Sequence, residues 1–114
     1  MVNQRGGMKK DTKEKLRDGE GAVHFTYLAD CENEKNIRML AELTLPPGAS
    51  IGYHRHDNET EYFLILSGGG EVNDNGDIKP VKAGDTVITG NGASHSIKNT
   101  GNVPLVFHAV IVTY

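Results

Sequence analysis

Turn-forming residues interrupt this chain so often that long helices have no room to form. Fourteen of its 114 residues are glycine, the residue that adopts turn conformations with positive φ at no steric cost. The stretches between the turns are short, and apolar and polar residues alternate in them with the period of two that is typical of β-strands. Short alternating strands separated by glycine-bearing turns predict an antiparallel all-β sandwich or barrel.

The predicted strands occupy most of the chain after residue 20. Two of them flank Asn75-Gly76, and Asn-Gly in this position is the strongest short signal for a β-hairpin. Residues 1–20 are rich in charged residues, and they are predicted to form an N-terminal arm, extended or with one helical turn, ahead of a β-barrel domain at residues 21–114. The strands expected in that domain are residues 23–28, 37–45, 50–55, 61–67, 71–74, 77–82, 86–89, 95–99 and 105–113.

The predicted strand at residues 61–67 is apolar on both of its faces. Phe63 and Ile65 share one face, and Tyr62, Leu64 and Leu66 share the other. A strand with two apolar faces is typically covered on both sides. We therefore expect this strand to be buried on both sides, either between two sheets or against a second copy of the chain.

The length and charge of the chain exclude several classes of protein. A chain of 114 residues fits one domain. Its 12 basic and 15 acidic residues give a net charge of −3, without the basic surplus that binding to nucleic acid requires. No stretch is long and apolar enough to span a membrane, and residues 1–7 do not resemble a signal peptide. Cys31 is the single cysteine, so no internal disulfide can form and a reducing, cytoplasmic location is expected.

Three of the five histidines are spaced as metal ligands would be. His54 and His56 lie two residues apart on a predicted strand and project from the same face. Glu61 starts the next strand after a polar loop at residues 57–60, and His95 opens a later strand. Imidazoles with one carboxylate suit a divalent transition metal ion such as Mn, Fe, Ni, Cu or Zn, and they do not suit calcium, which prefers oxygen ligands. Tyr53 is expected to point away from His54, into the core or an interface.

The spacing around the first histidines resembles a known sequence motif. Five residues separate Gly48 from the sequence His54-Arg55-His56, four more precede Glu61, and six more precede Gly68. This pattern resembles the first motif of the cupin superfamily without a gap.

The second cupin motif is also present, in the right order. Five residues separate Gly84 from Gly90-Asn91-Gly92, two more precede His95, and three more precede Asn99. The family usually has proline at the position of Gly90, so a looser turn is expected there. Asn99 is expected to bond to neighbouring backbone and to hold the turn after its strand.

The resemblance implies a fold and a site. The fold is the double-stranded β-helix, or jelly-roll barrel, with a six-stranded core, as in small single-domain bacterial cupins that resemble oxalate decarboxylases. Self-association into a homodimer is implied as well. One divalent metal ion would be held by the residues at the four ligand positions, which are His54, His56, Glu61 and His95.

The resemblance leaves the reaction open, and no catalytic residue is assigned. One hypothesis is a metal-dependent dioxygenase, decarboxylase, isomerase or lyase acting on a small carboxylate, enediol or related oxygen-bearing metabolite. The alternative is a non-catalytic module that binds a sugar or carboxylate through the metal. Oxalate decarboxylases have an arginine three residues before the first ligand, where this chain has Ile51, and this predicts a less charged pocket on that wall.

Other polar residues are weaker candidates. Glu59 is expected in the loop before Glu61 as an exposed carboxylate, with a proton-shuttling role as the alternative. His108 is expected to be a structural histidine, with a pocket acid–base role as the alternative, and His24 is expected to be peripheral. Arg38 and Glu42 share one strand face, as either a pocket pair or part of a solvated edge.

Overall fold

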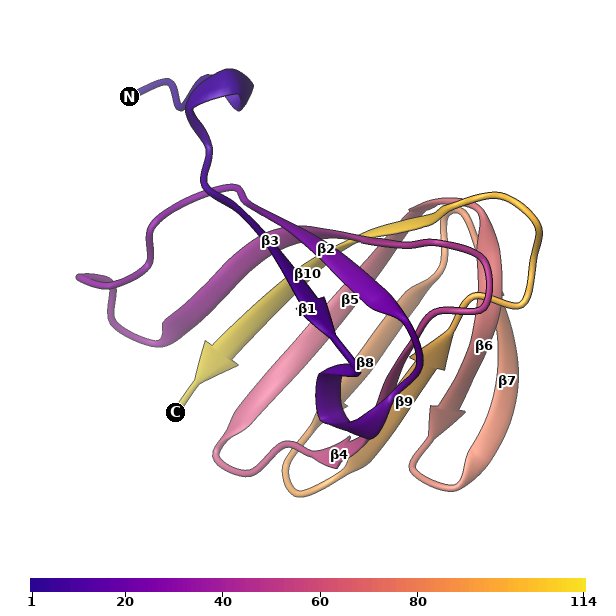
Figure 1. The fold of residues 1–114 in the computed structure, drawn as a ribbon. Coiled ribbons are helices and arrows are strands. Elements are labelled where there is room, and N and C mark those ends of the chain that lie inside the picture. Colours follow the sequence, from indigo (N-terminus) through magenta and orange to yellow (C-terminus); the bar gives the residue numbers. More distant parts are fainter.

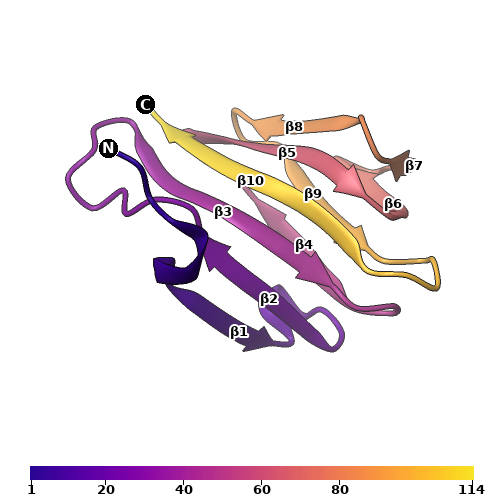
Figure 2. The same ribbon diagram turned by 90° about the horizontal axis from the view of Figure 1, so that it is seen from above.

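The short alternating strands form two antiparallel sheets that face each other across a common core. The computed structural model describes residues 1–114, and Figures 1 and 2 show the two layers. The six-stranded sheet has the order β1 (Lys10–Glu14), β2 (Ala22–Tyr27), β3 (Ile37–Leu45), β10 (Leu105–Thr113), β5 (Glu59–Ser67) and β8 (Thr86–Gly90). The four-stranded sheet has the order β4 (Ser50–Arg55), β9 (Ser94–Lys98), β6 (Gly69–Asp74) and β7 (Asp77–Lys82).

This architecture is the jelly-roll barrel that the sequence predicted. The Asn75-Gly76 turn joins β6 to β7 with positive φ at both residues, 50° and 105°, which is the conformation that favours Asn-Gly in two-residue hairpins. The only helices are two short 3₁₀ segments, η1 (Arg5–Gly7) and η2 (Leu16–Asp18). Neither of them is long and apolar enough to cross a membrane.

Part of the predicted N-terminal arm is a regular strand. Residues 10–14 form β1, which pairs along its whole length with β2 and extends the six-stranded sheet at its edge. The first residues project beyond the body of the sheets, as the indigo end of the ribbon in Figure 1 shows.

The core fills the space between the inner faces of the two sheets. Inward-facing residues alternate with outward-facing ones along each strand, as the period of two requires. Phe63 lies between this core and the histidines, because its ring is 4.6 Å from that of Phe107 and 4.8 Å from that of His95. Most of the buried hydrophobic residues form one cluster, which includes Val23, Phe25, Leu43, Leu45, Ile51, Phe63, Ile65, Val72, Ile97, Leu105 and Phe107.

The prediction that β5 is buried on both sides within the chain is wrong. Its inner residues Phe63 and Ile65 are buried, but Tyr62, Leu64 and Leu66 are 37%, 40% and 45% exposed. The reason is topological, because β5 lies between β10 and β8 in one sheet and no other element of the chain covers the outer face of these strands. The alternative, contact with a second copy, stays a prediction.

Gly84 and Asn99, two residues of the second motif, support the turns of the barrel. Gly84 has a φ of 97° in the turn before β8, a conformation that side chains with a Cβ rarely adopt. Asn99 is buried, and its side-chain amide donates to the carbonyls of Leu45 and Val103, each at 2.8 Å. Its side-chain oxygen accepts a hydrogen bond from the N–H of Gly101. These bonds hold the turn between β9 and β10.

Candidate metal centre

The backbone brings the four predicted ligands together from three strands of two sheets. His54 on β4 lies directly opposite His95 on β9 in the antiparallel register. His56 directly follows Arg55, the last residue of β4, so the strand has the predicted bounds and only His54 lies within it. The N–H of His56 donates to the carbonyl of Ala93 at 3.0 Å, and its carbonyl accepts from the N–H of Gly92 at 2.9 Å. These two bonds tie His56 to the segment that leads into His95.

The side chains converge on one point. The Nε2 atoms of His54, His56 and His95 lie 3.0 to 3.3 Å from one another. Glu61 reaches them from β5 in the facing sheet, with its Oε1 atom 3.1 Å from His56 Nε2 and 3.0 Å from His95 Nε2. The four ligand atoms all lie within 4.8 Å of one another. Together they form a three-histidine, one-glutamate cluster compatible with one metal ion.

The hydrogen bonds of the second ring nitrogens show why the Nε2 atoms point inward. The Nδ1 of His54 donates to the carbonyl of Gly52 at 2.7 Å, and the Nδ1 of His56 donates to a carboxylate oxygen of Glu59 at 2.5 Å. The Nδ1 of His95 lies 2.8 Å from the hydroxyl of Thr89. With protons on Nδ1, the Nε2 lone pairs are free to face the centre, which is the arrangement of metal-binding histidines.

The separations between the ligand atoms fit a six-coordinate ion. Two adjacent donors about 2.1 Å from an octahedral ion lie about 3.0 Å apart, whereas in a tetrahedral site they lie about 3.4 Å apart. Four of the five close contacts among these atoms are 3.0 or 3.1 Å and lie nearer the octahedral value, and the His54–His95 contact is 3.3 Å. The donor set and its spacing therefore both fit a divalent transition metal.

Burial and mutual contact shift the pKa values of these groups. Burial lowers the pKa of His54, the most exposed of the three histidines, so that its ring is neutral and able to coordinate. Burial also acts to lower the pKa of His56, but hydrogen bonds to Glu61 and Glu59 outweigh it and raise that pKa. Burial acts to raise the pKa of Glu61, yet its bonds to His56 and His95 lower it overall. Glu61 is therefore a buried carboxylate kept in its charged form.

The prediction that Glu59 is an exposed loop carboxylate is wrong. Glu59 is the first residue of β5, because pairing with Thr113 extends the strand beyond its apolar part, and its side chain is only 13% exposed. Arg38 donates to both carboxylate oxygens of Glu59, at 2.8 and 2.9 Å. The hydrogen bonds from Arg38, together with the one from His56, lower the pKa of Glu59 to about 2. Arg38 and Glu42 are thus not a pair with each other.

The remaining histidines lie outside the cluster. His108 Nε2 donates to Glu42 Oε1 at 3.1 Å, and Glu42 also pairs with Arg5 from the N-terminal segment. His108 therefore has a hydrogen-bond partner of its own, and its structural role stays a prediction. His24 is exposed on β2 beside Thr12 of the edge strand β1, which confirms the prediction of a peripheral position.

Two neighbours of His54 have different environments. Tyr53 is 51% exposed, so the prediction that it packs in the core is wrong, and its contact with a partner stays a prediction. Ile51 is 4% exposed and belongs to the hydrophobic core cluster. The position at which oxalate decarboxylases have arginine therefore holds a buried apolar side chain.

Gly90 packs closely against Thr60 in this chain. It pairs with Thr60 at the end of β8, and a Cβ atom added to it would lie 2.2 Å from the Thr60 hydroxyl. The Thr60 hydroxyl is 3.1 Å from the hydroxyl of Tyr114. The Tyr114 hydroxyl in turn is 2.8 Å from the side-chain oxygen of Asn91 and 3.1 Å from the backbone carbonyl of Glu59. This network connects the start of β5 to the turn that precedes His95.

Thr89, the partner of His95 Nδ1, is a residue of the site that the sequence reasoning missed. It is 1% exposed and sits on β8 opposite Glu61 in the register. A threonine in an alternating strand looks like any other strand residue, since threonine favours strands for its branched side chain alone. Strand alternation was the one available indication: Thr89 lies two residues after the buried Val87, so the two side chains face the same, inward side of β8.

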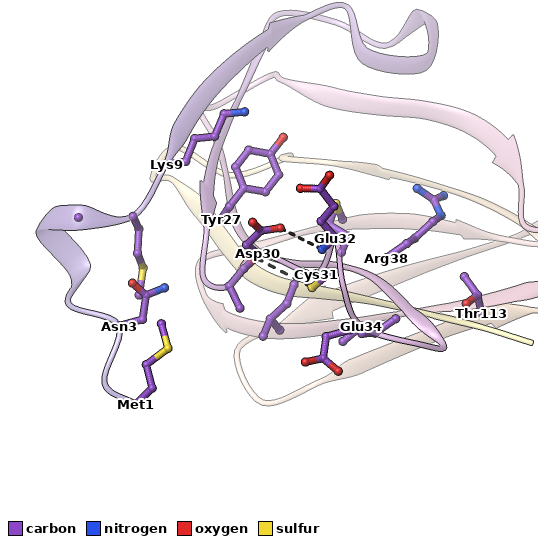
Figure 3. A pocket seen from close by; sticks show the side chains of 16 residues that line it. Met1, Asn3, Lys9, Tyr27, Asp30, Cys31, Glu32, Glu34, Arg38 and Thr113 are labelled. Atoms are coloured by element: carbon purple, nitrogen blue, oxygen red, sulfur yellow. Dashed lines mark hydrogen bonds between the residues drawn. The ribbon is translucent and has the colours of Figure 1, made fainter.

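A cavity of about 890 Å³ lies between the N-terminal segment, the loop after β2 and the start of β3. Figure 3 shows Arg38 and Lys9 on opposite sides of it, with Tyr27 between them. None of the four clustered residues lines this cavity. Arg38 connects the two regions, since it lines the cavity and is hydrogen-bonded to Glu59.

Comparison with known proteins identifies the family. A family model for the cupin domain matches residues 41–112, which include all four clustered residues. An oxalate-binding protein of Thermotoga maritima is 47% identical over 98 residues, which cover 85% of this chain and 81% of that protein. A crystal structure from Thermotoga maritima, described as a predicted oxalate decarboxylase, has a TM-score of 0.95 at 41% identity over 100% of both chains.

A more distant structure shares the fold alone. The cupin domain of Schizosaccharomyces pombe Cnp3 has a TM-score of 0.75 at 21% identity, covering 91% of this chain and 69% of that chain. The matched family model spans more than half of the chain, and it contains both histidine-bearing segments. The chain therefore belongs to the cupin family.

Proposed function

We propose that this chain binds one divalent transition metal ion and, through it, a small anion with two oxygen donors, of the oxalate class. The single observation that carries the proposal is the convergence of three Nε2 atoms and one carboxylate oxygen, with each Nδ1 hydrogen-bonded elsewhere. The residues that would hold the metal are His54, His56, Glu61 and His95.

The charge and number of the donors support an anionic chelating ligand. Glu61 is the only anionic residue of the four, so a divalent ion bound there would leave a net positive centre. Four protein donors around a six-coordinate ion leave two positions for a ligand with two oxygens. The Thermotoga maritima relative at 47% identity is named as oxalate-binding. Ile51 supplies no cation, so the metal itself would provide most of the attraction for an anion.

We propose binding as the primary function, with turnover of the same ligand as the second candidate. The similar structure described as a predicted oxalate decarboxylase favours turnover. A bound metal would supply Lewis-acid chemistry. A decarboxylase must also deliver a proton, and the carboxyl group beside the cluster carries none, because the hydrogen bonds from Arg38 and His56 lower the pKa of Glu59 to about 2. This arrangement favours binding.

Titration calorimetry of the Mn-, Ni- and Zn-loaded protein against oxalate, malonate and acetate tests the proposal. We expect oxalate to bind the metal-loaded protein with a stoichiometry of one, and acetate to bind far more weakly because it offers a single carboxylate. His54→Ala should lose both metal and oxalate binding. Oxalate that binds equally well to metal-free protein would contradict the proposal. Release of formate and carbon dioxide from oxalate would establish the second candidate instead.

We also propose that the outer face of the six-stranded sheet joins two copies of the chain. The support is the row of exposed apolar side chains on β5, continued by Ile88 on β8, which is 62% exposed. Contiguous exposed apolar surface of this kind marks interaction sites on small proteins. Light scattering tests this proposal, because a monomeric mass at every concentration would reject it.

A cytoplasmic location remains part of the proposal. Its support is a chain with one cysteine, half-buried in the loop after β2, and no disulfide. Detection of the protein in a membrane or extracellular fraction of its source cells would contradict it.

A further inference from the structure

His56 differs from the other two clustered histidines in the chemistry of its second ring nitrogen. His54 Nδ1 donates to a neutral backbone carbonyl, and His95 Nδ1 lies next to a neutral hydroxyl. His56 Nδ1 instead lies 2.5 Å from a carboxylate oxygen of Glu59. Hydrogen bonds to an ionised acceptor are shorter and stronger than neutral ones. One of the three rings is therefore held by a charged partner and two are not.

Glu59 is itself held in a fixed orientation. Arg38 Nε donates to Oε1 at 2.8 Å and Nη2 donates to Oε2 at 2.9 Å, which is the two-point geometry of an arginine–carboxylate pair. The Glu59 side chain is 13% exposed, whereas that of Arg38 is 48% exposed. The carboxylate is thus largely shielded from water while its cation faces the cavity (Figure 3).

The three residues come from three separate strands or their ends. Arg38 lies near the start of β3, Glu59 starts β5, and His56 follows β4 in the other sheet. In the six-stranded sheet β10 lies between β3 and β5, so the Arg38 side chain crosses the C-terminal part of β10 to meet Glu59. The hydrogen-bonded series therefore connects the two sheets at the level of the cluster.

We propose that Arg38 and Glu59 are a positioning pair for His56. The carboxylate keeps the proton on Nδ1, which leaves the Nε2 lone pair facing the centre and makes that nitrogen a stronger donor. Arg38 holds the carboxylate in place. The inference rests on the proposed metal site and deepens it, because it names the residues that set the tautomer and orientation of one ligand. Neither residue would contact the metal.

Zinc(II) is the probe, because it is diamagnetic and allows NMR of the histidine rings. Its affinity is measured by competition with a chromophoric chelator, for wild type and for Glu59→Leu, Glu59→Gln and Arg38→Met. The control is Glu71→Gln, which removes a carboxylate from an exposed site on β6. The second readout is the ¹H–¹⁵N spectrum of the His56 ring in the zinc-loaded protein, and urea unfolding of each metal-free variant checks that it folds.

We expect Glu59→Leu to weaken zinc binding about 10- to 100-fold, the usual effect of removing such a partner. Glu59→Gln keeps an acceptor oxygen but loses the charge, so it should weaken binding less and shift the Nδ1 proton signal upfield. Adding Arg38→Met to Glu59→Leu should cause no further loss, because the two residues act as a unit. Glu71→Gln should match wild type.

Unchanged zinc affinity together with an unchanged His56 Nδ1 signal in Glu59→Leu would overturn the inference and leave the proposed metal site intact. If Glu59→Leu fails to fold, Glu59→Gln decides the question by the same two readouts. A wild-type protein that binds no zinc at all would overturn the proposed function and this inference together.

Discussion

Binding of a metal ion should stabilise the folded chain, because the four ligands belong to three strands of two sheets and converge only when both sheets are in place. A ligand that binds only the folded state stabilises it by about 4.1 kcal/mol when its free concentration is about 1,000 times Kd. For 114 residues, the entropy of unfolding is about 0.24 kcal/mol per kelvin. The melting temperature should therefore rise by about 17 °C with zinc at that concentration.

Differential scanning calorimetry with and without zinc measures this shift. His54→Ala is the best variant, because His54 is the most exposed of the three histidines and its removal should disturb packing least. It should abolish most of the shift and leave the metal-free melting temperature near that of wild type. His24→Ala is the matched control, since His24 is exposed on β2 and lies outside the cluster.

Two results would refute this reasoning. A full shift retained by His54→Ala would mean that the ion binds elsewhere. A shift lost equally in His24→Ala would mean that zinc stabilises the protein through surface histidines.

Three further predictions concern residues that the structure placed. Thr89→Val removes the hydroxyl beside His95 Nδ1 and leaves that buried nitrogen unpaired. Urea unfolding of the metal-free protein should therefore show a free energy of unfolding about 1–3 kcal/mol lower than that of wild type, and equal stability would contradict this. The pKa of Glu59 is lowered from 4.5 to about 2, so its contribution to stability is present above pH 4.5 and is lost as the pH falls toward 2. The stability difference between wild type and Glu59→Gln should therefore shrink between pH 6 and pH 3 in urea unfolding, and a constant difference would argue against an ionised Glu59. Leu64→Glu should convert a dimer to a monomer in light scattering, whereas Ile78→Glu, a change at an exposed site on the other sheet, should not; dimers in both variants would reject the proposed interface.

The sequence was sufficient for the fold and for the four clustered residues. Alternation and turns are local properties, so the Asn75-Gly76 turn and the approximate positions of most strands could be read from neighbouring residues. The spacing of His54, His56 and Glu61 also works locally, since the short connection after β4 carries the chain into β5 of the facing sheet, where Glu61 lies across from the two histidines. His95 was linked to them only by the resemblance to the second motif, and the register of β4 with β9 shows the physical reason.

Tertiary structure decided the residues around the site and the faces of the sheets. Glu59 looked like a loop carboxylate because nothing nearby in sequence reveals that Thr113 pairs with it or that Arg38 reaches it. Burial of Leu64 could not be judged from an apolar strand alone, because it depends on whether another layer covers that face. Local patterns therefore determined which residues point inward along each strand. Only the assembled sheets determined what each inward or outward side chain meets, because those contacts join residues far apart in the chain.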